Sequence, residues 1–290
     1  GRGRDAAGQP FGGLAAGAAD GHSGAMIVAD QSETVAFLRA AAAAGTPDGG
    51  AAGVVETHIA VVVLGADTAW KLKRAVRLPY LDFSTAETRL AVCEREVTLN
   101  RRTAPALYRG VRRITRTPNG LAFDGDGPLV DAVVEMRRFD DADLFDRLAE
   151  AGKLTPALID RLAGTIARFH DAAEVRATGE GAARMAAVLD INARAFAAAG
   201  HFAKERVSTF VDGCAAALAG HAALLDRRAA AGRVRHGHGD LHLRNICLLD
   251  GEPTLFDCLE FDDEMATTDV LYDLAFLLMD LWHRGRRAEA

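Results

Sequence analysis

The chain is poor in cysteine and in aromatic side chains. It has four cysteines, and no two of them stand in a C-x-x-C arrangement, so the sequence suggests neither a zinc knuckle nor a thioredoxin-like redox pair. Four thiols in 290 residues are also too few for a disulfide scaffold. No secretory signal is recognisable, and together these features predict a protein of the reducing cytoplasm.

An excess of positive charge and long hydrophobic runs are missing as well. The chain has 34 basic and 40 acidic side chains and a formal net charge of -6. Broad nucleic-acid binding needs clustered positive charge, so no nucleic-acid partner is expected. The longest apolar runs, such as residues 59–64 and 274–279, are far shorter than the ~20 residues that cross a bilayer, which argues against a membrane protein.

What remains is ordinary globular composition, with 49% hydrophobic and 26% charged residues. Residues 1–25 are rich in glycine and alanine without periodicity, and we expect a disordered leader there. Strand-like segments dominate residues 26–137, whereas residues 138–290 are mostly helical around one small hairpin. The sequence therefore predicts an α+β fold with a β-rich first lobe and a helical second lobe.

Turn and capping residues locate the individual elements. Asp30 with Glu33, and Ser84 with Glu87, have the spacing of capping boxes and predict helices to about residues 44 and 102. Thr155-Pro156 predicts a further helix start. Strands are expected over residues 54–64 (one strand, or two with a kink near Thr57-His58), 68–74, 111–123, 129–137, 246–249 and 254–256, and a last helix from near Thr268.

The most informative stretch is 236–245, which reads HGHGDLHLRN. Asp240 and Asn245 are five residues apart, and Asp257 follows a short hairpin, which matches the catalytic-loop pattern of kinases. In such a loop one carboxylate accepts or orients the proton of an attacking hydroxyl. An amide and a second carboxylate hold Mg²⁺, because hard cations prefer oxygen ligands.

With the histidines included, this pattern resembles the aminoglycoside phosphotransferase and choline kinase-like family, which has the protein-kinase-like fold. The family motif H-G-D-x-H-x-x-N is present at residues 238–245, and residues 272–275 (YDLA) resemble a helix of the family. Together with residues 56–59 and 81–84, the pattern is most similar to a bacterial branch in which such a domain precedes a P-loop ATPase domain. The resemblance covers about residues 26–282, and no G-x-x-x-x-G-K-[ST] motif is present, so a fused or separate P-loop partner would be missing from this chain.

The resemblance implies a reaction and the residues that perform it. The reaction would be ATP- and Mg²⁺-dependent transfer of the γ-phosphoryl group to a hydroxyl of a small molecule. Asp240 would be the catalytic base, and Asn245 and Asp257 would be the Mg²⁺ ligands. Glu135-Met136, at the end of the last strand of the first lobe, would hydrogen-bond adenine through the backbone.

A lysine strand completes the implied nucleotide site. Lys71 is favoured as the phosphate-binding lysine, and Lys73 stays open because it points to the same strand face. Its acidic partner would be Glu96, with Glu94 as the second choice. The sequence departs from kinases in one respect, because no G-x-G-x-x-G precedes the lysine strand and residues 56–59 would have to cover the phosphates.

Two other functions remain open. A metal-dependent hydrolase could use His236, His238, Asp240, His242 and Asp257. A regulatory module could bind ATP and Mg²⁺ without transferring phosphate, serving a partner domain.

An acidic cluster lies just past Asp257 and suggests a rim that attracts a cationic acceptor. Its members are Glu260, Asp262, Asp263 and Glu264.

Overall fold

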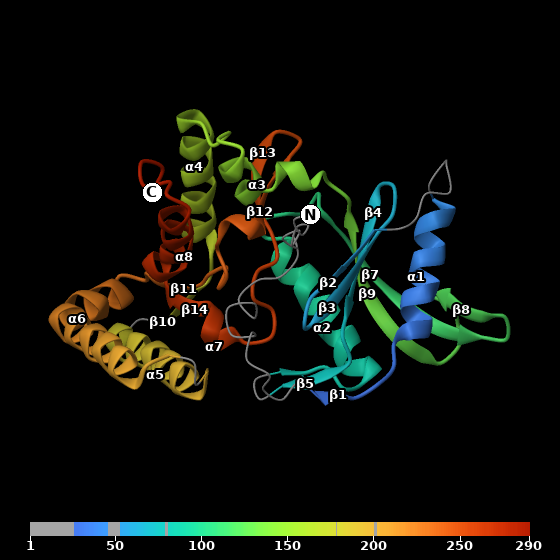
Figure 1. The fold of residues 1–290 in the computed structure, drawn as a ribbon, viewed down its shortest axis with the longest axis horizontal. Helices are drawn as coiled ribbons and strands as arrows, with labels where there is room; N and C mark the ends of the chain where they lie inside the picture. The colour runs from blue at the N-terminus through green and yellow to red at the C-terminus, as the bar shows by residue number, and fades with distance from the viewer. Residues whose placement is uncertain (1–25, 46–52, 79–80, 178, 200–201) are drawn as a thin grey trace, which may run out of the picture.

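The computed structural model describes residues 26–45, 53–78, 81–177, 179–199 and 202–290, and the expected leader lies outside them. A six-stranded antiparallel sheet with two helices forms one lobe, and helices α3–α8 with small β elements form the other (Figure 1). The two-lobed α+β architecture predicted from the sequence is thus confirmed. All four cysteines are free.

The sheet of the first lobe has the strand order β2-β3-β4-β9-β7-β8. Its strands are β2 (Gly53–Glu56), β3 (Ala60–Leu64), β4 (Thr68–Lys73), β7 (Tyr108–Thr117), β8 (Gly120–Phe123) and β9 (Leu129–Arg137). Beside it lies a small sheet of β1 (Met26–Ile27), β5 (Val76–Leu78) and β6 (Leu81–Asp82). Residues 54–64 form two strands around a turn at Thr57, the second of the two alternatives. Residues 111–123 were wrongly expected to be one strand, because a turn after Thr117 folds them into the β7–β8 hairpin.

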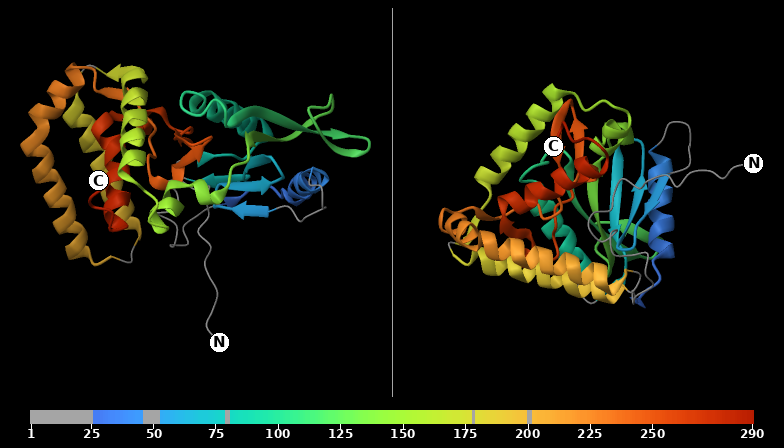
Figure 2. Two further views of the ribbon diagram at one scale, coloured as in Figure 1. Left: turned by 90° about the horizontal axis from the view of Figure 1, so that it is seen from above. Right: turned by 60° about the vertical axis from the view of Figure 1, so that its left-hand side comes forward.

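Helices α1 (Ser32–Ala44) and α2 (Ala86–Asn100) cover opposite faces of this sheet (Figure 2). Alternate residues of a strand point to opposite faces, so Val61 and Val63 pack with α1 whereas Val62 packs with α2. The same alternation on β4 sends Leu72 to the α1 side. Lys71 and Lys73 lie on the α2 side, where Lys71 meets Glu96.

The capping residues of the first lobe differ slightly from expectation. The N-cap of α2 is Thr85 rather than Ser84, and its side chain accepts a hydrogen bond from Thr88 N. Asp30 accepts from Ser32 N, but the N-cap position of α1 is Gln31. Gln31 instead ties the helix to the sheet through Lys73 O and Asp131. Tertiary hydrogen bonds therefore decide the helix start in place of a capping box.

The second lobe is built around the β12–β13 hairpin. Its helices are α3 (Phe145–Glu150), α4 (Pro156–Ala172), α5 (Gly181–Ala199), α6 (Lys204–Ala230), α7 (Asp263–Ala266) and α8 (Val270–His283), with 3-10 turns η1 (Asp141–Asp143) and η2 (Leu243–Asn245). Its strands are β10 (Val175–Ala177), β11 (Val234–His236), β12 (Ile246–Leu249), β13 (Glu252–Leu255) and β14 (Thr267–Asp269). Thr155 caps α4 with Pro156 in its first turn, as expected. In α8, Leu277 and Leu281 are buried, whereas the equally apolar Leu271 and Leu278 are exposed.

Helices α5 and α6 run side by side at the outer edge of this lobe (Figure 2). Within the described ranges, α6 is the helix that is long and apolar enough to cross a membrane by length and composition. Helix α6 contains no long continuous apolar run, because its hydropathy comes from alanines spread among polar residues. Core helices and signal sequences pass the same test. The absence of a membrane partner stays a prediction.

The two lobes share one hydrophobic cluster. Val62, Val97, Tyr108 and Met136 of the first lobe pack in the same cluster as Phe256 of the second. The chain crosses between the lobes after β9 ends at Arg137. This packing places β4 and α2 opposite the loops that precede β12 and follow β13.

Candidate active site

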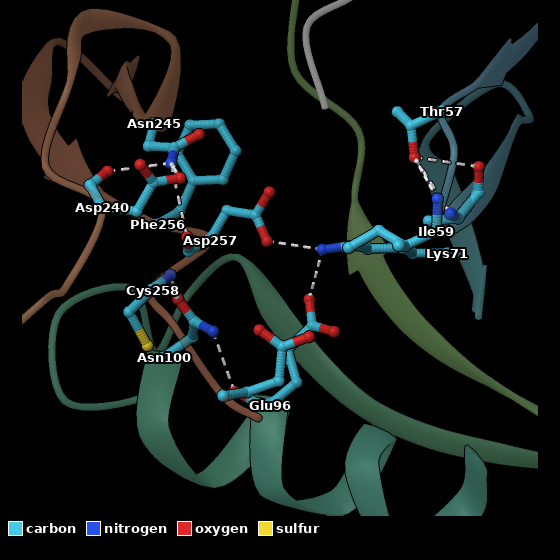
Figure 3. A network of polar contacts seen from close by, with 12 residues as sticks. Thr57, Ile59, Lys71, Glu96, Asn100, Asp240, Asn245, Phe256, Asp257 and Cys258 are labelled. Carbon is cyan, nitrogen blue, oxygen red and sulfur yellow. Dashed lines mark hydrogen bonds and ion pairs between the residues drawn. The ribbon is translucent and has the colours of Figure 1, made fainter. Parts of the chain in front are cut away.

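Lys71 is the lysine of β4 that contacts Asp257 of the second lobe. Its Nζ lies 2.8 Å from Glu96 Oε1 and 2.5 Å from Asp257 Oδ1 (Figure 3). Glu96 is fully buried, whereas Glu94 is exposed on the same helix. The structure thus brings together Lys71, Glu96 and Asp257, and it turns Glu94 away.

Lys73 lies on the same face of β4 but deeper in the protein. Its Nζ lies 2.5 Å from Glu96 Oε2 and also contacts Glu260. The Lys73 side chain is fully buried. The α2 carboxylate therefore divides its two oxygens between the two lysines, and Lys71 is the one next to Asp257.

The electrostatics of this cluster favour the charged forms of Lys71 and Asp257. Burial alone would lower the pKa of Lys71, but the carboxylates of Asp257 and Glu96 raise it well above its ordinary value. Burial would likewise raise the pKa of Asp257, yet Lys71 holds it below its ordinary value. Both groups are therefore ionised at neutral pH.

The loop between β11 and η2 holds Asp240 and Asn245 together. Asn245 Nδ2 donates to Asp240 Oδ2 at 2.8 Å and to Asp240 O at 2.9 Å. Asp240 Oδ1 is buried, accepts no hydrogen bond from the part of the chain that the structure describes, and lies 3.4 Å from His242 Nε2. Burial alone would lower the pKa of His242, but the carboxylate of Asp240 outweighs it and raises that pKa. One carboxylate oxygen of Asp240 is thus available to accept a proton or a hydroxyl.

Asp273 of α8 anchors the backbone of this loop. It accepts hydrogen bonds from His238 N at 3.0 Å, Gly239 N at 2.9 Å and His170 Nε2 at 2.9 Å. Gly239 has φ of +78°, and a Cβ there would lie 2.8 Å from that of Leu259, so the position requires glycine. His238 Nε2 bonds Phe256 O at 2.9 Å, which links the loop to the end of the hairpin.

Replacing Asp273 with asparagine tests this anchor. Asp273→Asn should lower the unfolding free energy by about 2–4 kcal/mol at neutral pH, because a buried, hydrogen-bonded charge is lost. Burial would raise the pKa of Asp273, but His170 and His238 hold it below 3.8. The stability that ionised Asp273 contributes is therefore present above about pH 3.8 and is lost as the pH falls through the folded-state pKa of Asp273.

Urea unfolding of both proteins as a function of pH provides the measurement. The difference in unfolding free energy should stay constant above about pH 5 and narrow below about pH 4. Equal unfolding free energies of the two proteins at neutral pH would contradict the anchoring role. A difference that stays the same below about pH 4 would also contradict it.

The hairpin returns Asp257 to the side of Asn245. Asp257 has φ of +59°, and its amide donates to the hydroxyl of Tyr108 at 3.2 Å. Cys258 N donates to Asn100 Oδ1 at 3.0 Å. These two bonds attach the segment after β13 to residues of the first lobe.

The donor set near Asn245 fits a magnesium ion. Asn245 Nδ2 lies 3.4 Å from Asp257 O, so the two residues are neighbours. Asn245 Oδ1 is fully buried and has no hydrogen-bond partner among the described residues. The orphaned amide oxygen of Asn245 and the ionised carboxylate of the neighbouring residue Asp257 are the hard oxygen ligands that Mg²⁺ prefers.

A hydrolase-type metal centre finds no support. Across the described ranges, no three His, Cys, Asp or Glu side chains are placed to hold a metal ion. The ring of His238 is bound to a backbone carbonyl, and buried His236 lies 3.2 Å from Asp263. His238 thus supports the loop.

Two nucleotide contacts were expected from the first lobe: residues 56–59 covering the phosphates, and Glu135-Met136 contacting adenine. The turn between β2 and β3 is closed by Thr57, whose Oγ1 accepts from Ala60 N at 2.9 Å, so a threonine turn stands where kinases have glycines. Glu135 and Met136 lie inside β9, paired with β4 and β7, and the Glu135 carboxylate bonds Trp70 and Arg112. Their contact with adenine stays a prediction.

The sequence alone did not assign Tyr108, Asn100 or Glu260 to the site. Each acts across a large sequence separation, and only Glu260 gave a signal, as a member of the acidic cluster. None of these contacts follows from local spacing.

Comparison with known proteins shows which family the chain matches. The sequence model of the phosphotransferase enzyme family matches residues 69–290. Uncharacterized proteins of Mycobacterium tuberculosis (Rv2004c) and Mycobacterium bovis (Mb2027c) are each 36% identical over 242 residues, which is 81% of this chain and 46% of theirs. The chain thus spans about half the length of these relatives.

Among solved structures, the GDP and kanamycin complex of APH(2″)-IIIa aligns with 90% of this chain and 82% of that chain, at 14% identity and a TM-score of 0.46. The family match covers most of this chain, including the lysine strand, the loop with Asp240 and the strand before Asp257. The chain belongs to the phosphotransferase enzyme family.

Proposed function

We propose that this protein transfers the γ-phosphoryl group of ATP to a hydroxyl of a small molecule in a Mg²⁺-dependent reaction. The observation that carries the proposal is the convergence of Lys71, Asp240, Asn245 and Asp257 from both lobes (Figure 3). The family supports phosphotransfer, and the polar cluster supports a nucleotide with a divalent cation.

In this proposal each side chain has one task. Lys71, held by Glu96, binds the phosphates, and Asn245 and Asp257 hold the magnesium ion. The bound ion neutralises charge on the phosphates. Asp240 orients the acceptor hydroxyl and accepts its proton through Oδ1, so catalysis consists mainly of positioning and charge stabilisation.

We infer that the acceptor carries positive charge. A cavity of about 420 Å³ lies between α2 and the segment after Asp257, and most of its charged lining is acidic: Asp82, Glu260, Asp262, Asp263 and Glu264, with Arg95 as the basic member. Asp263 pairs with Arg95, and Asp262 caps α7. Glu264 is largely exposed and pairs with Arg184 at 3.2 Å, so a cation would be attracted by the excess of acidic over basic side chains in this lining.

A regulatory module without transfer activity is the second candidate. Lys71 and Asp257 are paired directly with each other, so both nucleotide-binding groups are engaged in this conformation. A regulatory partner, such as a fused or separate P-loop ATPase domain, and a cytoplasmic location are further proposals from the sequence.

A thermal-shift screen followed by an acceptor panel separates these candidates. ATP and GTP are tested with and without Mg²⁺, and ADP release is then measured with cationic and neutral hydroxyl compounds. We expect stabilisation by ATP with Mg²⁺ and ADP release with at least one cationic acceptor. Binding without release across the panel would favour the regulatory module, and the absence of nucleotide binding would contradict both.

A further inference from the structure

Two lysines of one strand hold the segment that contains Asp257. Lys71 pairs with Asp257, and two residues further along β4, Lys73 pairs with Glu260. Because both lysines lie on the same face of β4, the two ion pairs connect the first lobe to successive points of residues 257–260. The second pair has no place in the catalytic assignment given above.

The two ion pairs differ in what nucleotide binding requires of them. Lys71 must turn to the phosphates and Asp257 to the magnesium ion, so their mutual contact has to be exchanged for ligand contacts. Lys73 and Glu260 are not assigned to the phosphates or the magnesium ion, because Lys73 is fully buried behind Glu96 and Glu260 is 5% exposed. Their pair can persist when the first one is broken.

We propose that Glu260, through Lys73, is a positioning residue that keeps Asp257 in place when Lys71 releases it. This inference rests on the proposed nucleotide site. Glu260 stands three residues after Asp257, and its backbone carbonyl also accepts from Arg95 Nε of α2 at 2.5 Å. The segment is thereby attached to both β4 and α2 at a single residue.

Glu260 also controls how Glu96 is shared. Lys73 occupies Glu96 Oε2, which leaves Oε1 for Lys71. Without the Glu260 carboxylate, Lys73 would have Glu96 as its remaining ion-pair partner and would compete with Lys71 for it. Glu260 therefore acts on both the lysine and the aspartate without touching the nucleotide.

Hydrogen exchange of the free protein tests the attachment independently of any ligand. The amides of Cys258 and Leu259, bonded to Asn100 Oδ1 and His238 O, report whether the segment opens. In Lys71→Ala we expect these amides to stay protected, because the second pair remains. In Lys71→Ala/Glu260→Gln they should exchange at least tenfold faster than in Lys71→Ala.

Asp250→Asn supplies the matched control. Asp250 forms an exposed ion pair with Arg137 at 2.7 Å, which also joins the two lobes. Added to Lys71→Ala, it should leave the exchange of both amides unchanged. If Lys71→Ala alone freed the segment as fully as the double variant does, or if Glu260→Gln added nothing, the proposal would be overturned.

Nucleotide affinity supplies a second readout. Glu260→Gln should weaken ATP binding at least fivefold with Mg²⁺ and by a clearly smaller factor without it, since the effect through Lys71 remains without the ion but the effect through Asp257 needs it. A purely structural role would weaken ATP binding equally with and without Mg²⁺.

A second variant, Lys73→Met/Glu260→Leu, replaces the charges with an apolar pair. Its melting temperature should recover while the Mg²⁺-dependent loss of ATP binding persists. Recovery of both the melting temperature and the ATP binding would overturn the proposal. If the wild type bound no nucleotide, the proposed function would fail, and the exchange experiment would still decide on the attachment.

Discussion

Asp240→Ala should reduce phosphoryl transfer by about three orders of magnitude or more, because the group that orients the attacking hydroxyl and accepts its proton is removed. Asp240 lies among buried residues and contacts Asn245 through one oxygen, which leaves the other for the acceptor. Binding of ATP with Mg²⁺ should change less than twofold, because the phosphates and the ion are held by other side chains. ADP release and calorimetric titration measure the two quantities.

Asp240→Asn separates the lost charge from lost packing. Asparagine keeps the size of the side chain and an oxygen that can accept from Asn245 Nδ2, so the loop should retain its fold. It cannot accept the proton as a carboxylate does, and transfer should fall as far as in Asp240→Ala. Full turnover by either variant would show that Asp240 is not the base.

Asp257→Asn should abolish most of the gain in ATP affinity that Mg²⁺ provides. Loss of a group outside the first coordination sphere typically costs 10–100-fold in metal affinity, so loss of a direct carboxylate ligand should cost roughly 100-fold or more. Binding of ATP without Mg²⁺ should be equal or tighter, because Lys71 is released from its partner 2.5 Å away. Titration of ATP with and without Mg²⁺ gives the ratio.

Asp250→Asn is a closely matched control for this variant. Asp250 and Asp257 both have positive φ, at +53° and +59°, and asparagine adopts this backbone region as readily as aspartate. The control therefore tests the same substitution under the same backbone constraint, at an exposed hairpin turn. Equal losses of Mg²⁺ dependence in the two variants would contradict the assignment of Asp257 as a metal ligand.

The catalytic loop was predictable from sequence because its geometry is local. Asp240 and Asn245 are joined within five residues, and the Asp250-Gly251 turn fixes how the hairpin returns to Asp257. The choice between Lys71 and Lys73 was not local, since a period of two puts both on one face. Glu96 contacts both lysines, and the contact with Asp257 favours Lys71.

The fold errors have similar physical causes. Residues 111–123 look like one β-rich run, and the turn after Thr117 is evident only when the pairing of Ile114 with Phe123 is known. Leu271 has the hydropathy of a core residue, but half of its surface stays exposed on α8 because nothing among the described residues covers it. Glu260 could not be assigned, since its partner Lys73 is 187 residues away in the sequence.

A crystal structure with Mn²⁺ and a non-hydrolysable ATP analogue tests the central claim most directly. The account predicts an anomalous manganese peak at bonding distance from Asn245 Oδ1 and Asp257, with Lys71 on the phosphates and Asp240 open toward the γ-phosphate. A nucleotide bound elsewhere, or a metal ion that Asn245 and Asp257 do not touch, would contradict it.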